Sequence, residues 1–362
     1  MERIKFLFFI PNFNMGGAEK VMLNIVRELD ATYFEIHIAV VLKEGPLYSL
    51  VPESVKVHEL GTSKVLLSVL KLRNLIKKLS PAMIYSTLFR THIALDIALS
   101  SIKIRPIVIL RNPTSPKLIL KEKNLGAIEK FFLVKAYSNA SHILAQTPDM
   151  KKELVQYFHL EEERIQVFIN PLDTASIQEG IKNIKNPFDV NRINVVAMGR
   201  LGKEKALDVL LKAFKLVVQK NHHYVLHIIG RDVGEKKSLL KLRETLNLEE
   251  NVKFWDEQSN PYRFYYFSDL YVLSSIREGL PNTVLENLYM KKPIVATKCV
   301  PFMSELIKNG KNGFLVKVGD INQLAEKILQ YKEIDVKSYG MLESQIDTNE
   351  FFKTCLNRMA FE

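Results

Sequence analysis

The sequence alternates short apolar, β-rich runs with amphipathic stretches, and this alternation limits the possible folds more than any other feature. Each run has the length of a buried strand, and each amphipathic stretch has the length of a covering helix. Repeated strand–helix units build a parallel sheet with helices on both faces. The first series of predicted strands comprises residues 4–10, 35–42, 55–58, 83–85, 106–110, 142–145 and 165–168, and the second comprises 194–198, 224–229, 252–255, 270–273, 294–297 and 313–316.

The two series predict two doubly wound α/β domains, and 362 residues are enough to bury two cores. The segment 170–191 carries two prolines and several turn-forming residues, so we expect the linker there. We assign residues 1–175 to an N-terminal domain and 176–337 to a C-terminal domain. For residues 338–362 we expect a C-terminal helix that packs back on the N-terminal domain.

The first residues and the cysteines bear on the compartment. The apolar run 6–10 ends at Pro11 and is too short for a signal peptide or a membrane-spanning helix. Cys299 and Cys355 make no disulfide framework and have no metal-ligand spacing, which fits a reducing compartment. We therefore expect a cytoplasmic protein.

The formal net charge of +11 is concentrated in one stretch, because eleven basic residues and one acidic residue lie between Leu60 and Lys121. Such a stretch predicts an anionic partner, which can be lipid, nucleic acid or a phosphorylated substrate. On a helical wheel of residues 63–79, lysines align beside an apolar stripe, and Leu67 and Leu70 fall outside that stripe. This pattern suits an anionic membrane surface and a lipid-linked acceptor, with a solvated amphipathic helix as the alternative. The predicted face comprises Lys64, Lys71, Arg73, Lys77 and Lys78.

Two strand–helix turns carry residues suited to anions. Gly16 and Gly17 follow the first strand, where paired glycines let backbone N–H groups approach an anion at a helix N-terminus. A purely structural turn is an equal alternative. The second domain opens with a strand, then Arg200, then Lys205 ahead of a helix, so both cations are expected in the crevice at the carboxyl ends of the strands. Solvated side chains are the alternative here.

The segment 274–288 has the most specific pattern. Glu278 and Glu286 lie eight positions apart, and a tight loop between them leads into a helix that begins near Thr283. A carboxylate binds a vicinal diol well because each oxygen accepts one hydrogen bond. We therefore expect Glu286 to bind a ribose and Glu278 to bind sugar hydroxyls.

With these motifs, the chain resembles the family 4 glycosyltransferases of the GT-B fold, of the type that assembles bacterial polysaccharides. The resemblance runs along essentially the whole sequence, through Gly16-Gly17-Ala18-Glu19, Asn170-Pro171 with Asp173, Gly199-Arg200-Leu201 with Lys205, Gly230, the 278–286 signature and Asn309-Gly310 with Gly313. It implies two Rossmann-like domains facing across a cleft, with the donor on the C-terminal domain and the acceptor side on the N-terminal domain. Two positions depart from the family: Ala206 stands where a Gly usually follows the Lys, and Trp255-Asp256 replaces a common Leu-Gly.

The resemblance also implies roles for single residues. By this resemblance the diphosphate of the donor is bound by Gly16, Gly17, Arg200 and Lys205, and Gly230 also lies in the donor site. Glu286 binds the ribose. Glu278 is the catalytic carboxylate at the donor sugar, which is also contacted by Gly279, Leu280, Pro281, Asn282 and Thr283.

The reaction implied is sugar transfer with retention, from a nucleotide sugar to a glycan or lipid-linked glycan for the cell surface. UDP is the commonest donor nucleotide in such families, and GDP stays open. We expect no metal and no cofactor, because Arg200, Lys205 and helix dipoles can absorb the charge of the leaving diphosphate. His92 is a candidate catalytic residue beside the transferred sugar, with a structural role equally open. The enzyme is expected to associate peripherally with the inner face of a membrane.

Two other classes of function are compatible with this length and charge. Nucleic-acid binding is disfavoured because the sequence shows no helix-turn-helix, zinc or aromatic RNA-binding signature. A sugar-nucleotide epimerase or another enzyme on the same scaffold stays open, because a fold does not fix a function.

Overall fold

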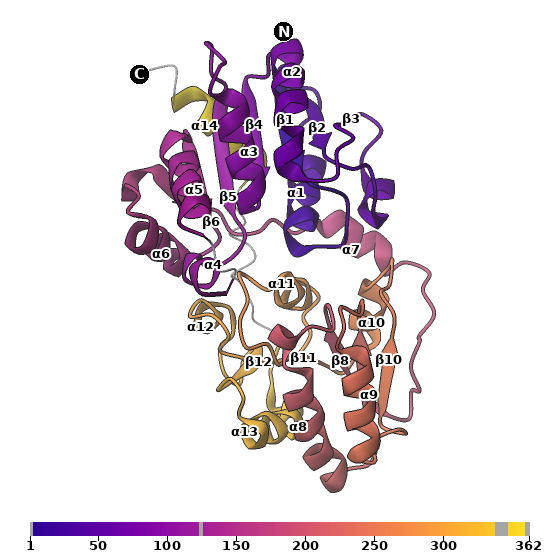
Figure 1. The fold of residues 1–362 in the computed structure, drawn as a ribbon. Helices are drawn as coiled ribbons and strands as arrows, with labels where there is room; N and C mark the ends of the chain where they lie inside the picture. Colours follow the sequence, from indigo (N-terminus) through magenta and orange to yellow (C-terminus); the bar gives the residue numbers. More distant parts are fainter. Residues whose placement is uncertain (1–2, 123–125, 337–346, 359–362) are drawn as a thin grey trace. The chain divides into compact units, whose positions relative to one another are not determined.

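The computed structural model describes residues 3–122, 126–336 and 347–358. The described chain divides into two compact units (Figure 1). Unit 1 comprises Met1–Asp173 and Gln345–Glu362, and unit 2 comprises Thr174–Ser344. Each unit has a parallel β-sheet with helices on its faces, as the alternating pattern of the sequence predicts.

Unit 1 has a seven-stranded sheet of order β3-β2-β1-β4-β5-β6-β7. Its strands are β1 (Ile4–Ile10), β2 (Phe34–Val40), β3 (Lys56–Glu59), β4 (Met83–Thr87), β5 (Ile107–Asn112), β6 (His142–Ala145) and β7 (Ile165–Val167). Its helices are α1 (Gly17–Glu28), α2 (Val69–Leu79), α3 (Phe89–Leu99), α4 (Pro116–Glu122), α5 (Ala127–Asn139), α6 (Pro148–Phe158) and α14 (Thr348–Arg358), with 3₁₀ turns η1 (Pro46–Leu50), η2 (Val65–Ser68) and η3 (Glu162–Arg164).

The two faces of this sheet carry separate cores. Along β1, Leu7 and Phe9 join the cluster beneath α2, α3, α5 and α6, whereas Phe6 and Phe8 join the cluster beneath α1 and α14. Alternate side chains of a strand point to opposite faces, so a strand that is apolar at every position is buried on both. The continuous apolar run of residues 6–10 therefore fits the interior position of β1, between β2 and β4.

Unit 2 has a six-stranded sheet of order β10-β9-β8-β11-β12-β13. Its strands are β8 (Ile193–Met198), β9 (Tyr224–Ile229), β10 (Val252–Trp255), β11 (Leu270–Leu273), β12 (Ile294–Thr297) and β13 (Gly313–Val316). Its helices are α7 (Thr174–Gly180), α8 (Leu207–Lys220), α9 (Lys236–Thr245), α10 (Tyr262–Phe267), α11 (Asn282–Tyr289), α12 (Met303–Leu306) and α13 (Ile321–Leu329), with 3₁₀ turns η4 (Lys203–Lys205) and η5 (Tyr331–Glu333).

The strand order reverses once in each sheet, between β1 and β4 in unit 1 and between β8 and β11 in unit 2. At such a point the connections leave toward opposite faces of the sheet and open a crevice at the carboxyl ends of the strands. Gly16 and Gly17 follow β1, and Arg200 follows β8. Both predicted anion-binding turns therefore lie at switch points.

The prediction of one helix over residues 63–79 is wrong at its start. Residues Val65–Ser68 form the 3₁₀ turn η2, and α2 begins at Val69, so Lys64 precedes any helical turn. Within the segment 170–191, residues Thr174–Gly180 form helix α7. At the other end of the chain, Phe352 of α14 lies in the core cluster beneath α1, and Asn349 donates to the carbonyl of Glu28 at 2.9 Å. Residues 337–346 and 359–362 of the predicted C-terminal segment lie outside the described residues.

None of the described helices is both long and apolar enough to cross a membrane.

Candidate functional site

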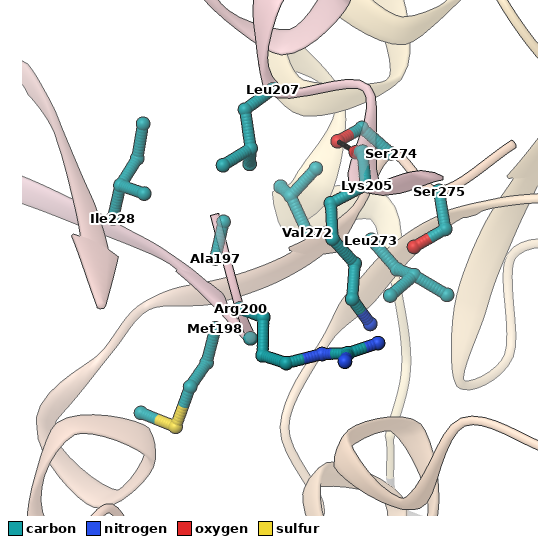
Figure 2. A pocket seen from close by; sticks show the side chains of 11 residues that line it. Ala197, Met198, Arg200, Lys205, Leu207, Ile228, Val272, Leu273, Ser274 and Ser275 are labelled. Atoms are coloured by element: carbon teal, nitrogen blue, oxygen red, sulfur yellow. Dashed lines mark hydrogen bonds between the residues drawn. The ribbon is translucent and has the colours of Figure 1, made fainter. Parts of the chain in front are cut away.

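Unit 2 has a pocket at its switch point, where β8, β9 and β11 end. Figure 2 shows the side chains of Arg200 and Lys205 extending into this pocket from the connection between β8 and α8. The floor is apolar, and serines from the end of β11 close one side. The lining residues are Ala197, Met198, Gly199, Arg200, Lys205, Leu207, Ile228, Val272, Leu273, Ser274 and Ser275. Two cations at the carboxyl edge of a parallel sheet suit an anionic ligand.

Two glycines allow the strands to approach each other at this edge. A Cβ on Gly230 would lie 1.9 Å from the carbonyl oxygen of Gly199, and both residues have positive φ, +155° and +151°. A side chain at either position is therefore strained. Gly230 shapes the edge of the pocket through its backbone.

Lys205 and Glu278 form an ion pair beside the pocket. Lys205 Nζ donates to Glu278 Oε1 at 2.6 Å, and the hydroxyl of Ser275 donates to the same oxygen at 2.7 Å. Both charged side chains are largely buried, with 18% and 16% exposed. The pair joins the loop after β8 to the loop after β11.

Backbone contacts hold the same two loops together. Ser274 Oγ donates to the carbonyl of Lys205 at 2.7 Å, and the amide of Ile276 donates to the carbonyl of Glu204 at 2.8 Å. Thr297 Oγ1, at the end of β12, donates to the carbonyl of Ser275 at 2.6 Å. The ends of three strands thereby fix the position of Glu278.

Arg200 is more exposed than Lys205 and is paired with a neighbour. Its Nη2 lies 3.2 Å from Glu204 Oε1, with 53% of the arginine side chain exposed. An exposed pair of this kind contributes little to stability. The guanidinium can therefore turn toward an anionic ligand at small cost.

Glu286 lies on α11, where the sequence predicts it, and it is buried rather than solvated. Tyr265, on α10, lies beside it: its hydroxyl is 3.0 Å from Met198 Sδ, and burial together with the charge of Glu286 raises the pKa of this phenol. Nearby, Tyr271 donates to Thr283 Oγ1 at 2.6 Å. Residues 279–281 lead directly into the first turn of α11, with Pro281 at its N-cap.

In unit 1, the Gly16–Gly17 turn begins α1, with Gly16 at the N-cap. A Cβ on Gly16 would lie 2.0 Å from Glu19 Oε2, so the glycine leaves room for that carboxylate. Arg111, at the end of β5, is buried and interacts electrostatically with Glu19. The structure places these groups in a different unit from Arg200, Lys205 and Glu286.

Of the two roles left open for His92, the structure favours the structural one. Its side chain is completely buried on α3, where Nδ1 lies 3.1 Å from Ser86 Oγ and the ring packs edge-on against Tyr137. Burial lowers the pKa of His92 to about 3, so the ring is neutral and enclosed at physiological pH. A group in this position does not reach a sugar, and we assign His92 to the core of unit 1.

The basic residues of the predicted membrane face divide into two groups. Lys64, Lys71, Lys77 and Lys78 are exposed, as are Leu66, Leu67 and Leu70. Arg73 is half-buried, and its guanidinium donates to the carbonyls of Ile97 and Ala98 at 3.0 and 3.1 Å. A cation on the last carbonyls of a helix stabilises its C-terminus. Arg73 therefore caps α3 and leaves the predicted face.

Among the residues that the structure describes, no group of three or more His, Cys, Asp and Glu side chains is arranged to hold a metal ion.

Sequence reasoning missed the residues that support the charged ones. Ser275 and Glu204 belong to no recognisable sequence motif. Ser275 contacts Glu278 within a local turn, and Glu204 contacts Arg200 and the amide of Ile276. Tyr265 and Tyr271 lie in an apolar stretch that reads as core. The short spacing of Tyr271 from the 278–286 signature is the one available hint.

Comparison with known proteins covers both units. The family of "Glycosyltransferase Family 4" matches residues 15–176, and that of "Glycosyl transferases group 1" matches residues 180–345. A relative from Campylobacter jejuni, N-acetylgalactosamine-N,N'-diacetylbacillosaminyl-diphospho-undecaprenol 4-alpha-N-acetylgalactosaminyltransferase, is 27% identical over 343 residues, which cover 90% of each chain. The poly(ribitol-phosphate) alpha-N-acetylglucosaminyltransferase of Staphylococcus aureus is 27% identical over 58% of this chain and 41% of the relative.

Solved structures share the fold. The Anabaena protein HepE, in complex with UDP and glucose, superposes with a TM-score of 0.76 at 21% identity, over 99% of this chain and 98% of that chain. WaaG, a glycosyltransferase involved in lipopolysaccharide biosynthesis, superposes with a TM-score of 0.69 at 14% identity, over 90% of each chain. The two matched families together span nearly all of the sequence, and both sheets have the expected topology. The chain therefore belongs to the family 4 glycosyltransferases of the GT-B fold.

Proposed function

We propose that this enzyme transfers a hexosyl or N-acetylhexosaminyl group from a UDP-sugar, with retention of configuration, to a glycan or lipid-linked glycan in the synthesis of a bacterial cell-surface polysaccharide or glycoconjugate. The observation that carries the proposal is the ion pair of Lys205 with Glu278 beside the pocket at the switch point of unit 2, with Glu286 buried on α11, the helix that follows Glu278 in the chain. The names of the relatives from C. jejuni and S. aureus and the UDP complex of HepE support the acceptor class and the nucleotide.

In this proposal the donor diphosphate binds beside Arg200 and Lys205. Lys205 then contacts both the diphosphate and Glu278, because its ammonium has three donors and Glu278 uses one. As the bond from the anomeric carbon to the diphosphate oxygen breaks, negative charge develops on the leaving oxygen next to these cations. The acceptor hydroxyl attacks from the same face and gives its proton to the leaving diphosphate. Positive side chains meet the charge of the leaving group, so the reaction is proposed to need no metal.

The exposed residues around α2 are proposed to bind the acceptor side at a membrane. Lys64, Lys71, Lys77 and Lys78 present positive charge, and Leu67 and Leu70 are 63% and 66% exposed beside them. Basic residues near an anionic lipid surface contribute about 1 kcal/mol each, and exposed leucines add apolar contact with the acyl region. The enzyme is thereby proposed to work in the cytoplasm on the inner face of the membrane.

Calorimetric titration with UDP and GDP, without added metal, tests the donor site. We expect saturable binding of UDP, and at least tenfold weaker binding by Glu286→Ala, since a carboxylate that accepts ribose hydroxyls contributes about 1.5–3 kcal/mol. Glu305→Ala is the matched control, because Glu305 is an exposed glutamate of the same unit, on α12. Failure of the wild-type chain to bind any nucleotide would overturn the proposal.

A further inference from the structure

Two buried tyrosines lie beneath the first two turns of α11. Tyr265 of α10 and Tyr271 of β11 are both 0% exposed, and their rings meet edge to face with centroids 5.6 Å apart. Tyr271 donates to Thr283 Oγ1 of α11 at 2.6 Å, and Tyr265 packs against Tyr271 beside Glu286 of the same helix. Thr283 and Glu286 are three positions apart and therefore lie on the same face of the helix.

The hydroxyl of Tyr265 has a choice of acceptors. It lies 3.0 Å from Met198 Sδ, at the end of β8, as well as beside the Glu286 carboxylate. A phenol has one proton to donate, and an ionised carboxylate is a much stronger acceptor than a thioether. The proton of Tyr265 therefore goes to Glu286, and the sulfur fills the remaining space.

The surroundings keep this donor in place. Burial, together with the charge of Glu286, raises the pKa of Tyr265 well above its ordinary value, and burial raises that of Tyr271. Both hydroxyls are therefore protonated at neutral pH. Glu286 is itself only 3% exposed. A fixed donor beside one oxygen of its carboxylate therefore limits the orientations open to the whole carboxylate group.

We propose that Tyr265, braced by Tyr271, is a positioning residue that orients the Glu286 carboxylate toward the ribose hydroxyls and thereby sets the enzyme's preference for a ribonucleotide donor. The inference rests on the proposed role of Glu286 in binding the ribose. It assigns the preference to a tyrosine that does not touch the nucleotide.

The test compares UDP with 2′,3′-dideoxy-UDP by calorimetry on wild type, Tyr265→Phe and the control Tyr266→Phe. The wild type is expected to bind UDP at least tenfold more tightly than the dideoxy analogue. Tyr265→Phe is expected to lose roughly tenfold in affinity for UDP and to bind the analogue unchanged, because only the diol interaction needs an oriented carboxylate. Tyr266 is 46% exposed on the same helix, so its hydroxyl should have no effect.

If Tyr265→Phe alters the fold, a double variant with Glu286→Ala still tests whether Tyr265 acts through Glu286. In the Glu286→Ala background, Tyr265→Phe should change neither affinity further, since the group it positions is gone. Equal weakening of both ligands by Tyr265→Phe, no weakening of either, or a further loss in the double variant would overturn the inference. These outcomes are distinct from failure of the donor site itself, in which the wild type would not bind UDP or Glu286→Ala would not weaken it.

Discussion

Breaking the ion pair between Lys205 and Glu278 should destabilise unit 2 before any substrate is added. Two unit charges 2.6 Å apart attract by about 6 kcal/mol at an effective dielectric constant of 20, and desolvation of both groups offsets most of this. Removing one partner of a fully buried pair costs about 3–5 kcal/mol, and of an exposed pair about 0–1 kcal/mol. With 18% and 16% of the side chains exposed, we expect Lys205→Met to lower the free energy of unfolding by about 2 kcal/mol.

The assay is urea unfolding followed by the fluorescence of Trp255. This residue is the single tryptophan of the chain and lies in unit 2, so the signal reports that unit. Glu278→Gln should also be destabilising, and the double variant should lose at least 1 kcal/mol less than the sum of the single losses. The control Lys212→Met breaks an exposed pair with Asp208 and should change stability by less than about 0.5 kcal/mol. A loss for Lys205→Met no larger than the control's, or strictly additive losses, would show that the pair of Lys205 and Glu278 does not stabilise unit 2.

Further predictions concern His92, the need for a metal ion and the exposed face around α2. Burial lowers the pKa of His92 to about 3 from an ordinary 6.5, so unfolding below pH 6 takes up a proton at this residue. The free energy of unfolding should therefore fall by about 1.4 kcal/mol for each pH unit below pH 6 because of His92. His92→Gln should flatten this acid limb of the stability curve, measured by circular dichroism. The pH–rate profile should show no limb from His92, and a limb near pH 6.5 that vanishes in His92→Gln would contradict its assignment to the core. A chelator should leave turnover unchanged; loss that is restored by magnesium or manganese would show that Arg200 and Lys205 do not suffice. The chain should sediment with vesicles rich in anionic lipid, and added salt should weaken this binding. The double variant Leu67→Asp/Leu70→Asp should bind at least tenfold more weakly, because each aspartate replaces an exposed apolar side chain by a negative charge that the anionic lipid repels. Unchanged sedimentation of the variant would place the membrane contact elsewhere.

The sequence was sufficient to predict every strand of the two sheets within a few residues, because buried parallel strands are apolar at nearly every position. The predicted strand 106–110 ended too early for a physical reason. Arg111 and Asn112 are the last two residues of β5 and are both buried. Polar residues after an apolar run predict a loop, so the sequence alone ends the strand before them. The helix predicted over residues 63–79 began too early, because η2 has a similar apolar spacing to a true helical turn.

The candidate site was predictable for charged residues in a recognisable pattern: the spacing of Glu278 and Glu286 predicts them as site residues, and their roles stay predictions. The contact of Tyr265 with Met198, 67 positions away, depends on tertiary structure and has no signal in the sequence. The departure at position 206 has a local meaning, since Ala206 has a φ of +46°, a left-handed conformation that glycine adopts without strain. The sequence leaves both roles of His92 open, because a histidine near a strand end has the same sequence context whether its ring faces solvent or the core.

The most direct test of the account is a transfer assay with labelled UDP-sugars and a polyprenyl-diphosphate-linked saccharide acceptor, for the wild type and Glu286→Ala, with the configuration of the new bond read by NMR. We expect UDP to be released in step with a glycosylated acceptor of retained anomeric configuration, and Glu286→Ala to lower kcat/KM at least tenfold. An epimerised nucleotide sugar without release of UDP, or an inverted product, would contradict it.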